Sequence, residues 1–390
     1  MYVDGAGVNV YKNLVEKTAG NHRLLSVQWE LTYRCNERCT HCYLDVFKPN
    51  AKVAGELSTE ECLGVLDQLA EMGTLNLTLT GGEAFTRRDF FEIASYARQK
   101  RFLLRIFTNG ITINARLADR LADLHPYAVE LSLYGVDAAT HDALTLIPRS
   151  HELTLRAMRL LRERGIRIVM KTPLMRENVH QYHALRALAD ELGAQFRYDT
   201  TITPKDNGSL EPLKHRLTQN DLVWLMRETL NPETYKPAPD VPTRRTCGIG
   251  TNALVIDPYG NVYPCVQTRA KAGNVREQSV RDIWENSPVW QDMDGLTISA
   301  LPVCNTCELR TMCSRCHGLA LVEDGDLYGP AYANCRSAMA RRQVLIEAGV
   351  LAPDYPIPAH LQGLEQAERS LTAGHFVPLA AVSAQTPVAA

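Results

Sequence analysis

Short runs of β-branched and other apolar residues alternate with longer amphipathic stretches over the first half of the chain. The runs fall at residues 25–31, 75–80, 103–107, 128–133, 166–170 and 195–200. Each is short enough to be one buried strand, and between them apolar residues recur about every 3.6 positions, which predicts helices. Strands alternating with helices predict a parallel α/β sheet. Six such units are enough for most of a (β/α) barrel, and a doubly wound open sheet is the alternative.

The second half of the chain has a different character. Residues 206–246 hold many Pro, Asn, Asp and Gly around one helical stretch, and they are expected to bridge two domains. Residues 247–340 are rich in turns and Cys, so a small core there would need bound metal. The domains expected on this basis are an N-terminal segment (1–23), a barrel (24–205), the bridge, a Cys-rich domain (247–340) and a C-terminal helix with a disordered tail (341–390).

Charge and hydropathy argue against two classes of partner. The 42 Lys and Arg nearly balance the 44 Asp and Glu among 390 residues, so no broad basic surface is available for nucleic acid. No apolar run reaches the roughly 18 to 20 residues that span a bilayer, and the polar start lacks the order of a signal peptide. The chain is therefore expected to be cytoplasmic, with no nucleic-acid or membrane partner.

The chain has eleven cysteines, and the cytoplasm keeps thiols reduced, so metal ligation or catalysis is their expected use. Cys35, Cys39 and Cys42 lie within eight residues, in the loop after the first expected strand. Three thiolates so close in sequence can ligate three irons of a cubane cluster and leave the fourth iron open. A zinc site is the alternative, with His41 as its fourth ligand.

Polar motifs follow the next expected strands. A Gly-Gly-Glu motif at 81–83 ends the second strand, a Thr-Asn-Gly motif at 108–110 ends the third, and Ser132 lies near the end of the fourth. The carboxyl ends of parallel strands share one face, so these motifs are expected beside the cysteine loop. Each motif alone is typical of an ordinary turn, but together they predict a polar mouth.

With Tyr43 directly after it, the Cys35-x3-Cys39-x2-Cys42 motif resembles the hallmark of the radical SAM superfamily, and the resemblance covers about residues 24–205. It implies a partial (β/α)6 TIM-like barrel in which the three cysteines hold a catalytic [4Fe-4S] cluster, with S-adenosylmethionine on the open iron. It implies further contacts to S-adenosylmethionine: Tyr43 near the adenine, Glu83 on the methionyl ammonium, Gly81 and Gly82 through the backbone, and Asn109 and Ser132 on ribose or carboxylate. Ala84 stands where many members have Pro.

Seven more cysteines follow the bridge. Cys247 and Cys265 lie on either side of Gly260, with twelve residues before the glycine and four after it. The others are Cys304, Cys307, Cys313, Cys316 and Cys335. This order resembles the SPASM domain, the auxiliary-cluster extension of radical SAM enzymes that modify peptides and proteins, although two residues rather than three separate Cys313 from Cys316. The resemblance implies one auxiliary cluster fully ligated by Cys304, Cys307, Cys313 and Cys335. It implies a second held by Cys247, Cys265 and Cys316, with an open iron, a non-Cys ligand or [2Fe-2S] composition. Zinc ribbons are the alternative.

Cys62 is left over. Ser58 followed by Glu61 is a capping-box pattern that predicts a helix start, and Cys62 lies on the apolar stripe of that helix with Leu66 and Leu69. A buried structural thiol is expected there.

The resemblance predicts a maturase that cleaves S-adenosylmethionine reductively to a 5′-deoxyadenosyl radical and abstracts hydrogen from a ribosomally made peptide or protein, giving a crosslink, an epimer or an oxidised side chain. An electron donor such as flavodoxin or ferredoxin is implied. About 23 residues precede the first expected strand, so a separate leader-binding protein is expected. Many anaerobic sulfatase maturases have Asp directly after the cysteine that matches Cys265. This chain has Val266 there, which weakens an assignment as a sulfatase maturase. The alternatives are an enzyme for a haem-related cofactor precursor and a non-catalytic zinc-stabilised binding protein.

Overall fold

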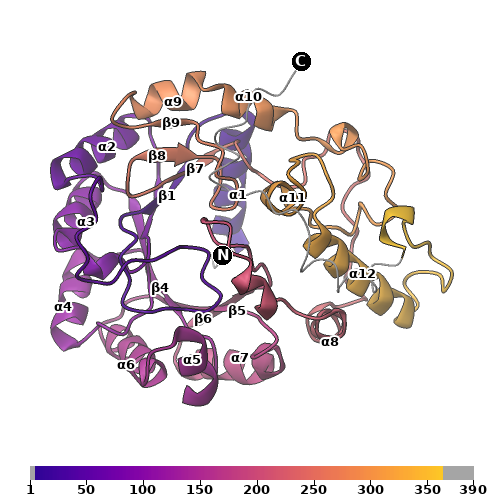
Figure 1. The fold of residues 1–390 in the computed structure, drawn as a ribbon, viewed down its shortest axis with the longest axis horizontal. Helices are drawn as coiled ribbons and strands as arrows, with labels where there is room; N and C mark the ends of the chain where they lie inside the picture. Colours follow the sequence, from indigo (N-terminus) through magenta and orange to yellow (C-terminus); the bar gives the residue numbers. More distant parts are fainter. Residues whose placement is uncertain (1–4, 363–390) are drawn as a thin grey trace.

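A curved sheet of nine strands forms the centre of the computed structural model, which describes residues 5–362. The strand order is β6-β5-β4-β3-β2-β1-β7-β8-β9, and Figure 1 shows the strands as an arc with helices outside it. The first six are parallel: β1 (Ser26–Glu30), β2 (Asn76–Thr80), β3 (Leu103–Thr108), β4 (Ala128–Ser132), β5 (Ile168–Pro173) and β6 (Gln195–Asp199). Each overlaps one expected run, and the predicted partial barrel is confirmed.

Six helices cover the outer face of the parallel strands. They are α2 (Thr59–Glu71), α3 (Phe90–Gln99), α4 (Ala115–Leu124), α5 (Ala138–Thr145), α6 (Ser150–Glu163) and α7 (Tyr182–Glu191). Strand residues such as Trp29, Leu79 and Ile106 are fully buried in the core beneath these helices. Side chains alternate across a strand, so Glu30, next to Trp29, points to the inside of the arc.

Helix α2 carries two of the sequence predictions. The Ser58 hydroxyl accepts the Glu61 N–H at 3.2 Å and the Glu61 carboxylate accepts the Ser58 N–H at 2.7 Å, which is the predicted capping box. Cys62, the next residue, is fully buried in the core with Leu66 and Leu69. Its side chain therefore contributes to packing.

The sheet continues beyond the six expected strands. Strand β7 (Ala253–Ile256) pairs in parallel with β1, and β8 (Asn261–Tyr263) and β9 (Gly273–Asn274) extend it in antiparallel fashion. Helices α9 (Val280–Asn286) and α10 (Pro288–Asp294) pack on the same core. The first part of the expected Cys-rich domain is thus continuous with the barrel core. Its strands have only two to four residues, too few to show a hydrophobic period.

The start of the chain forms a helix, α1 (Gly5–Gly20), where only an N-terminal segment was expected. The Asn252 amide donates to the Val15 carbonyl at 3.1 Å, and the Asn76 amide donates to the Tyr11 hydroxyl at 3.1 Å. Asn252 and Asn76 lie at the amino ends of β7 and β2. Helix α1 therefore packs at the end of the barrel opposite the predicted mouth.

The last part of the chain forms a smaller unit beside the barrel (Figure 1). It contains α11 (His317–Asp324) and α12 (Tyr332–Glu347), and α12 is joined to α8 (Gln219–Thr229) by the Arg227–Glu347 ion pair at 2.8 Å. The remaining elements are the 3-10 turns η1 (Ala84–Thr86), η2 (Val179–Gln181), η3 (Glu211–His215), η4 (Ile298–Ala300) and η5 (Ala359–Leu361). Helix α12 crosses the boundary expected at 340, and the expected tail lies outside the described residues.

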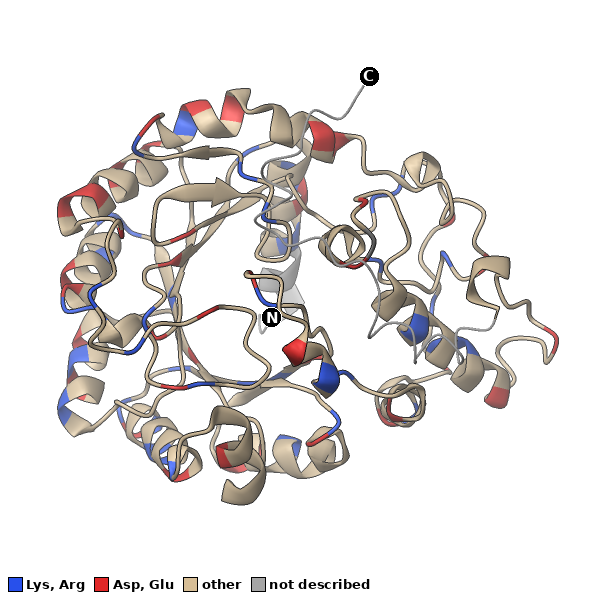
Figure 2. Ribbon diagram, viewed as in Figure 1, with Lys and Arg blue, Asp and Glu red and all other residues tan. Residues whose placement is uncertain are grey.

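Charges of both signs are spread over the outer helices (Figure 2). Within residues 5–362, no helix combines the length and the apolar character needed to cross a membrane.

Candidate active site

Residues 31–47 leave the carboxyl end of β1 as a loop that closes on itself. The Cys35 N–H donates to the Phe47 carbonyl and the Phe47 N–H donates to the Tyr33 carbonyl, both at 2.9 Å. Inside the loop, the Cys42 N–H donates to the Cys39 carbonyl at 3.1 Å, which forms a tight turn. The sequence predicted this loop and its place, and the structure adds the hydrogen bonds that hold its shape.

The three thiols of the loop lie close enough to influence one another. Burial raises the pKa of Cys42 to about 11. Burial also raises the pKa of Cys39, and the neighbouring Glu37 carboxylate and the two other thiols raise it further. Three thiolates at this spacing are favoured only beside a positive charge, which bound metal supplies. The loop therefore fits a metal cluster.

The Gly-Gly-Glu motif lies against the cysteine loop. The Gly82 N–H donates to the Thr32 carbonyl and the Glu83 N–H to the Arg34 carbonyl, both at 2.8 Å. Gly81 has a φ of +138°, and a Cβ at Gly82 would lie 2.5 Å from the Arg34 carbonyl oxygen. These glycines are needed because two backbone segments run side by side without room for side chains.

The carboxylate of Glu83, which follows β2, is held by hydrogen bonds at the carboxyl end of β3. Its carboxylate accepts the Thr108 hydroxyl at 2.9 Å, the Asn109 N–H at 2.9 Å and the Phe85 N–H at 3.1 Å. Burial raises the pKa of Glu83 to about 6, against these hydrogen bonds, which favour the ionised form. The Asn109 amide donates to Asn36 of the cysteine loop at 2.7 Å. Two predicted motifs and the cysteine loop thus form one hydrogen-bonded group.

Tyr43 belongs to a buried ion-pair cluster that the sequence did not reveal. Its hydroxyl donates to Glu30 at 2.6 Å, and Tyr33 donates to the other Glu30 oxygen at 3.0 Å. Arg269 binds both oxygens of Glu30, at 2.8 and 3.0 Å, and its Nε donates to the Val266 carbonyl at 3.0 Å. Glu30 and Arg269 are 239 positions apart, so no local pattern could pair them. The cluster joins the cysteine loop to the turn after Cys265.

Ser132 lies at the end of β4, also beside the cysteine loop. Two residues further on, the ring of Tyr134 packs edge-on against His41 with centroids 4.5 Å apart. Burial lowers the pKa of His41 to about 3, so this ring stays neutral at physiological pH.

The inner wall of the barrel below the loop is polar and charged. Glu130 on β4 accepts Arg105 of β3 at 2.6 Å, and its carboxylate lies 3.7 Å from the Lys171 ammonium of β5. Lys171 also lies 3.6 Å from the ring centre of Phe107. A substrate entering the barrel would meet these groups.

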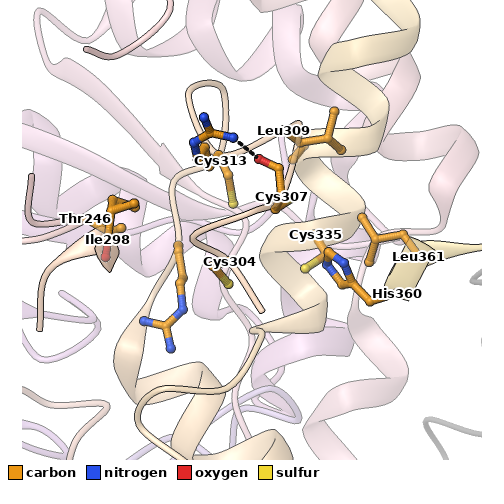
Figure 3. Close-up of a pocket in the computed structure, with 12 residues that line it drawn as sticks. Thr246, Ile298, Cys304, Cys307, Leu309, Cys313, Cys335, His360 and Leu361 are labelled. Atoms are coloured by element: carbon orange, nitrogen blue, oxygen red, sulfur yellow. Dashed lines mark hydrogen bonds between the residues drawn. The ribbon is translucent and has the colours of Figure 1, made fainter. Parts of the chain in front are cut away.

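The seven C-terminal cysteines form two groups. Cys304, Cys307, Cys313 and Cys335 line one pocket in the smaller unit, and Figure 3 shows their side chains around a common space. Cys247, Cys265 and Cys316 form the other group, in which burial, with a smaller contribution from the other two thiols, raises the pKa of Cys316 to about 11. The structure brings together the same four and the same three cysteines that the SPASM resemblance implied, and their role as ligands stays a prediction.

Three thiols at the open end of a parallel barrel, with two more thiol groups in the C-terminal part, indicate a metalloprotein built on a partial barrel. Comparison with known families makes the class specific. The model of the radical SAM superfamily matches residues 29–189, and that of SPASM, an iron-sulfur cluster-binding domain, matches residues 247–317. The chain belongs to the radical SAM superfamily and carries a SPASM domain.

Individual relatives agree with this assignment. The chain is 32% identical over 287 residues to mycofactocin maturase MftC of Mycobacterium ulcerans, covering 69% of this chain and 76% of that protein. It is 27% identical over 328 residues to AdoMet-dependent heme synthase of Methanosarcina barkeri, covering 77% and 93%. SuiB of Streptococcus suis, bound to precursor peptide SuiA, superposes with a TM-score of 0.63 at 18% identity over 83% of this chain and 79% of that chain, which shows a shared fold.

The enzyme therefore uses iron–sulfur clusters, one of them a [4Fe-4S] cluster with S-adenosylmethionine. When bound, that cluster and cofactor supply a 5′-deoxyadenosyl radical. The zinc alternatives are set aside, because iron–sulfur family models cover both cysteine regions.

We expect Gly82→Ala to disrupt the cysteine loop, because the new methyl group would lie 2.5 Å from the Arg34 carbonyl oxygen. Iron bound per chain after anaerobic reconstitution should fall by one cluster, about four irons. Gly64→Ala is the matched control, since a Cβ at Gly64 on α2 meets nothing within 4 Å. Equal iron content in the two variants would show that the close approach of the two backbones is not required.

Proposed function

We propose that this enzyme abstracts a hydrogen atom from a ribosomally synthesised peptide or protein, and so forms a crosslink, an epimer or an oxidised side chain. The observation that carries the proposal is the combination of a radical SAM barrel with two separate SPASM thiol groups in one chain. The relative at 32% identity is named a maturase, which supports the same class of substrate.

The proposed roles of the chain's residues follow the geometry of the mouth. Cys35, Cys39 and Cys42 hold the cluster that binds S-adenosylmethionine. Glu83, already fixed by Thr108 and two backbone N–H groups, offers its carboxylate to the methionyl ammonium. Gly81 and Gly82 give backbone access, and Asn109 and Ser132 contact ribose or carboxylate. The Tyr43 hydroxyl is committed to Glu30, so its contribution near the adenine is the face of its ring.

The two C-terminal thiol groups would hold auxiliary clusters, one on Cys304, Cys307, Cys313 and Cys335 and one on Cys247, Cys265 and Cys316. After loss of one hydrogen atom, a crosslink or an oxidised side chain requires the substrate to give up a proton and one more electron. The SPASM thiol groups are where this chain would place the electron acceptor.

The charged inner wall is the proposed contact surface for the peptide. Arg105, Glu130 and Lys171 offer both signs of charge and hydrogen bonds to a polar chain. A leader-binding protein and a donor such as flavodoxin or ferredoxin would complete the system. The eleven free thiols favour a reducing compartment, the cytoplasm.

The test is an anaerobic reaction with dithionite, S-adenosylmethionine and a candidate precursor peptide, chosen from short open reading frames found next to this enzyme's gene. A crosslink or oxidation should lower the peptide mass by two hydrogen atoms, and an epimerisation in D2O should add one deuterium. The Cys39→Ala variant should leave the peptide unchanged. An unmodified peptide in the presence of 5′-deoxyadenosine would contradict the substrate assignment.

A haem-related precursor is the second candidate substrate. One observation favours it: the match to AdoMet-dependent heme synthase covers 93% of that protein. Consumption of such a precursor, with the peptide untouched under the same conditions, would select this alternative.

A further inference from the structure

The thiol group of Cys247, Cys265 and Cys316 has one cysteine fewer than a fully ligated [4Fe-4S] cluster needs. A fourth protein group is present at this place. The side-chain oxygen of Gln267 lies 3.0 Å from the Cys316 sulfur, and Gln267 comes two positions after Cys265 in the chain. Gln267 thus contacts the Cys316 sulfur and lies in the turn that follows Cys265.

The backbone of Gln267 is fixed on both sides. The Thr268 N–H donates to the Cys265 carbonyl at 3.1 Å, which closes a turn around Gln267. A Cβ on Gly318, in the first turn of α11, would lie 2.6 Å from the Gln267 carbonyl oxygen, so the turn and the helix are pressed together. Arg269 anchors the next residues to Glu30 of the barrel.

The contact with Cys316 must change when the cysteine is deprotonated. As a thiol, Cys316 donates its S–H to the Gln267 oxygen. A cysteine bound to iron is a thiolate and has no proton to donate. The Gln267 amide oxygen would then face the lone pairs of the sulfur and lose its hydrogen bond. Binding to the positively charged metal would replace that lost interaction.

Other side chains of this region serve less well as the fourth ligand. Val266 has no donor atom. The ring nitrogens of His317 are already engaged, Nε2 with the Thr246 hydroxyl at 3.0 Å and Nδ1 with the Leu327 carbonyl at 3.1 Å. The Thr268 hydroxyl is buried without a hydrogen-bond partner among the residues described, which makes it the competitor to test.

We propose that the side-chain amide oxygen of Gln267 is the fourth ligand of the auxiliary cluster held by Cys247, Cys265 and Cys316. This cluster then has no open iron, and it serves electron transfer rather than substrate binding. The inference rests on the proposed function, since it needs the auxiliary cluster to exist.

The experiment uses the full chain with Cys35, Cys39 and Cys42 all replaced by Ala, which removes the other open-iron site. After anaerobic reconstitution and reduction, the electron paramagnetic resonance spectrum is recorded with and without sodium cyanide, a small ligand for open iron. The spectrum of this parent protein should not change. Gln267→Ala should make one of the two auxiliary signals sensitive to cyanide, and Gln267→Cys should restore the insensitivity with a shifted signal. Thr268→Val should behave as the parent.

Three outcomes would overturn the inference. These are cyanide sensitivity in the parent, insensitivity in Gln267→Ala with both signals intact, and sensitivity in Thr268→Val. If Gln267→Ala loses the cluster altogether, retention of that cluster in Gln267→Cys supports ligation and its loss contradicts it. A parent without iron in the C-terminal part would count against the proposed function instead.

Discussion

Replacing Cys35, Cys39 or Cys42 with Ala should abolish the formation of 5′-deoxyadenosine from S-adenosylmethionine. Each of the three thiolates would ligate one iron of the cluster, and two thiolates are too few to hold the cluster stably. The loss should be complete to the detection limit in an anaerobic chromatographic assay with dithionite as reductant.

Cys62→Ala is the matched control for these variants. Cys62 is fully buried on α2 beside Leu66 and Leu69, so its loss should cost about 1–2 kcal/mol of stability through packing alone. Formation of 5′-deoxyadenosine should stay within about twofold of the unmodified enzyme, because the thiol holds no metal. Full activity in the Cys39→Ala variant would contradict the assignment of the cysteine loop.

Arg269→Met should give a large loss of stability. The substitution leaves the Glu30 carboxylate buried beside the barrel wall without its cation, and breaking a buried pair in this way typically costs about 3–5 kcal/mol. It also frees the turn after Cys265 from the barrel. The midpoint of denaturant unfolding should move to a lower denaturant concentration, and the iron content of the C-terminal part should fall.

Two further variants test this explanation. Arg227→Gln removes one partner of the solvent-exposed Arg227–Glu347 pair, and its unfolding midpoint should be unchanged. Glu30→Gln combined with Arg269→Met removes both charges and should recover part of the lost stability. If Arg269→Met unfolds at the midpoint of Arg227→Gln, the buried cluster is not a structural link between barrel and SPASM turn.

The barrel was predictable because its signals are local. Each parallel strand is a short apolar run, and the Gly-Gly-Glu and Thr-Asn-Gly motifs follow their strands at once, so the rule that strand ends share a face was enough to place them. Helix α2 gave a capping box that the structure confirms. Such features need only a few adjacent residues to be recognised.

Features that depend on distant contacts were not predictable. Strand β7 has four residues, and its place beside β1 depends on a pairing between Ser26 and Ala253. The Glu30–Arg269 pair joins the first strand to the turn after Cys265, across 239 positions. Helix α1 was not predicted, and its contacts with the barrel come from Asn252 and Asn76, which are far from it in the sequence. In each case the tertiary contact, rather than the local sequence, determines the structure.

The site also differs in detail from what its motifs alone indicate. Glu83 was expected as a free carboxylate for a ligand amine, yet it already accepts three neighbouring donors in the protein. These bonds fix its orientation before any ligand arrives, which lowers the entropy cost of binding. The Tyr43 hydroxyl is likewise committed to Glu30.

The most direct test of the account is the electron paramagnetic resonance spectrum of the reduced enzyme with and without S-adenosylmethionine. If the loop of Cys35, Cys39 and Cys42 holds a cluster with one iron free for the cofactor, one signal should shift when S-adenosylmethionine is added, and that signal should be missing from the Cys39→Ala variant. A spectrum that S-adenosylmethionine leaves unchanged, or a shifting signal that persists in Cys39→Ala, would contradict the account.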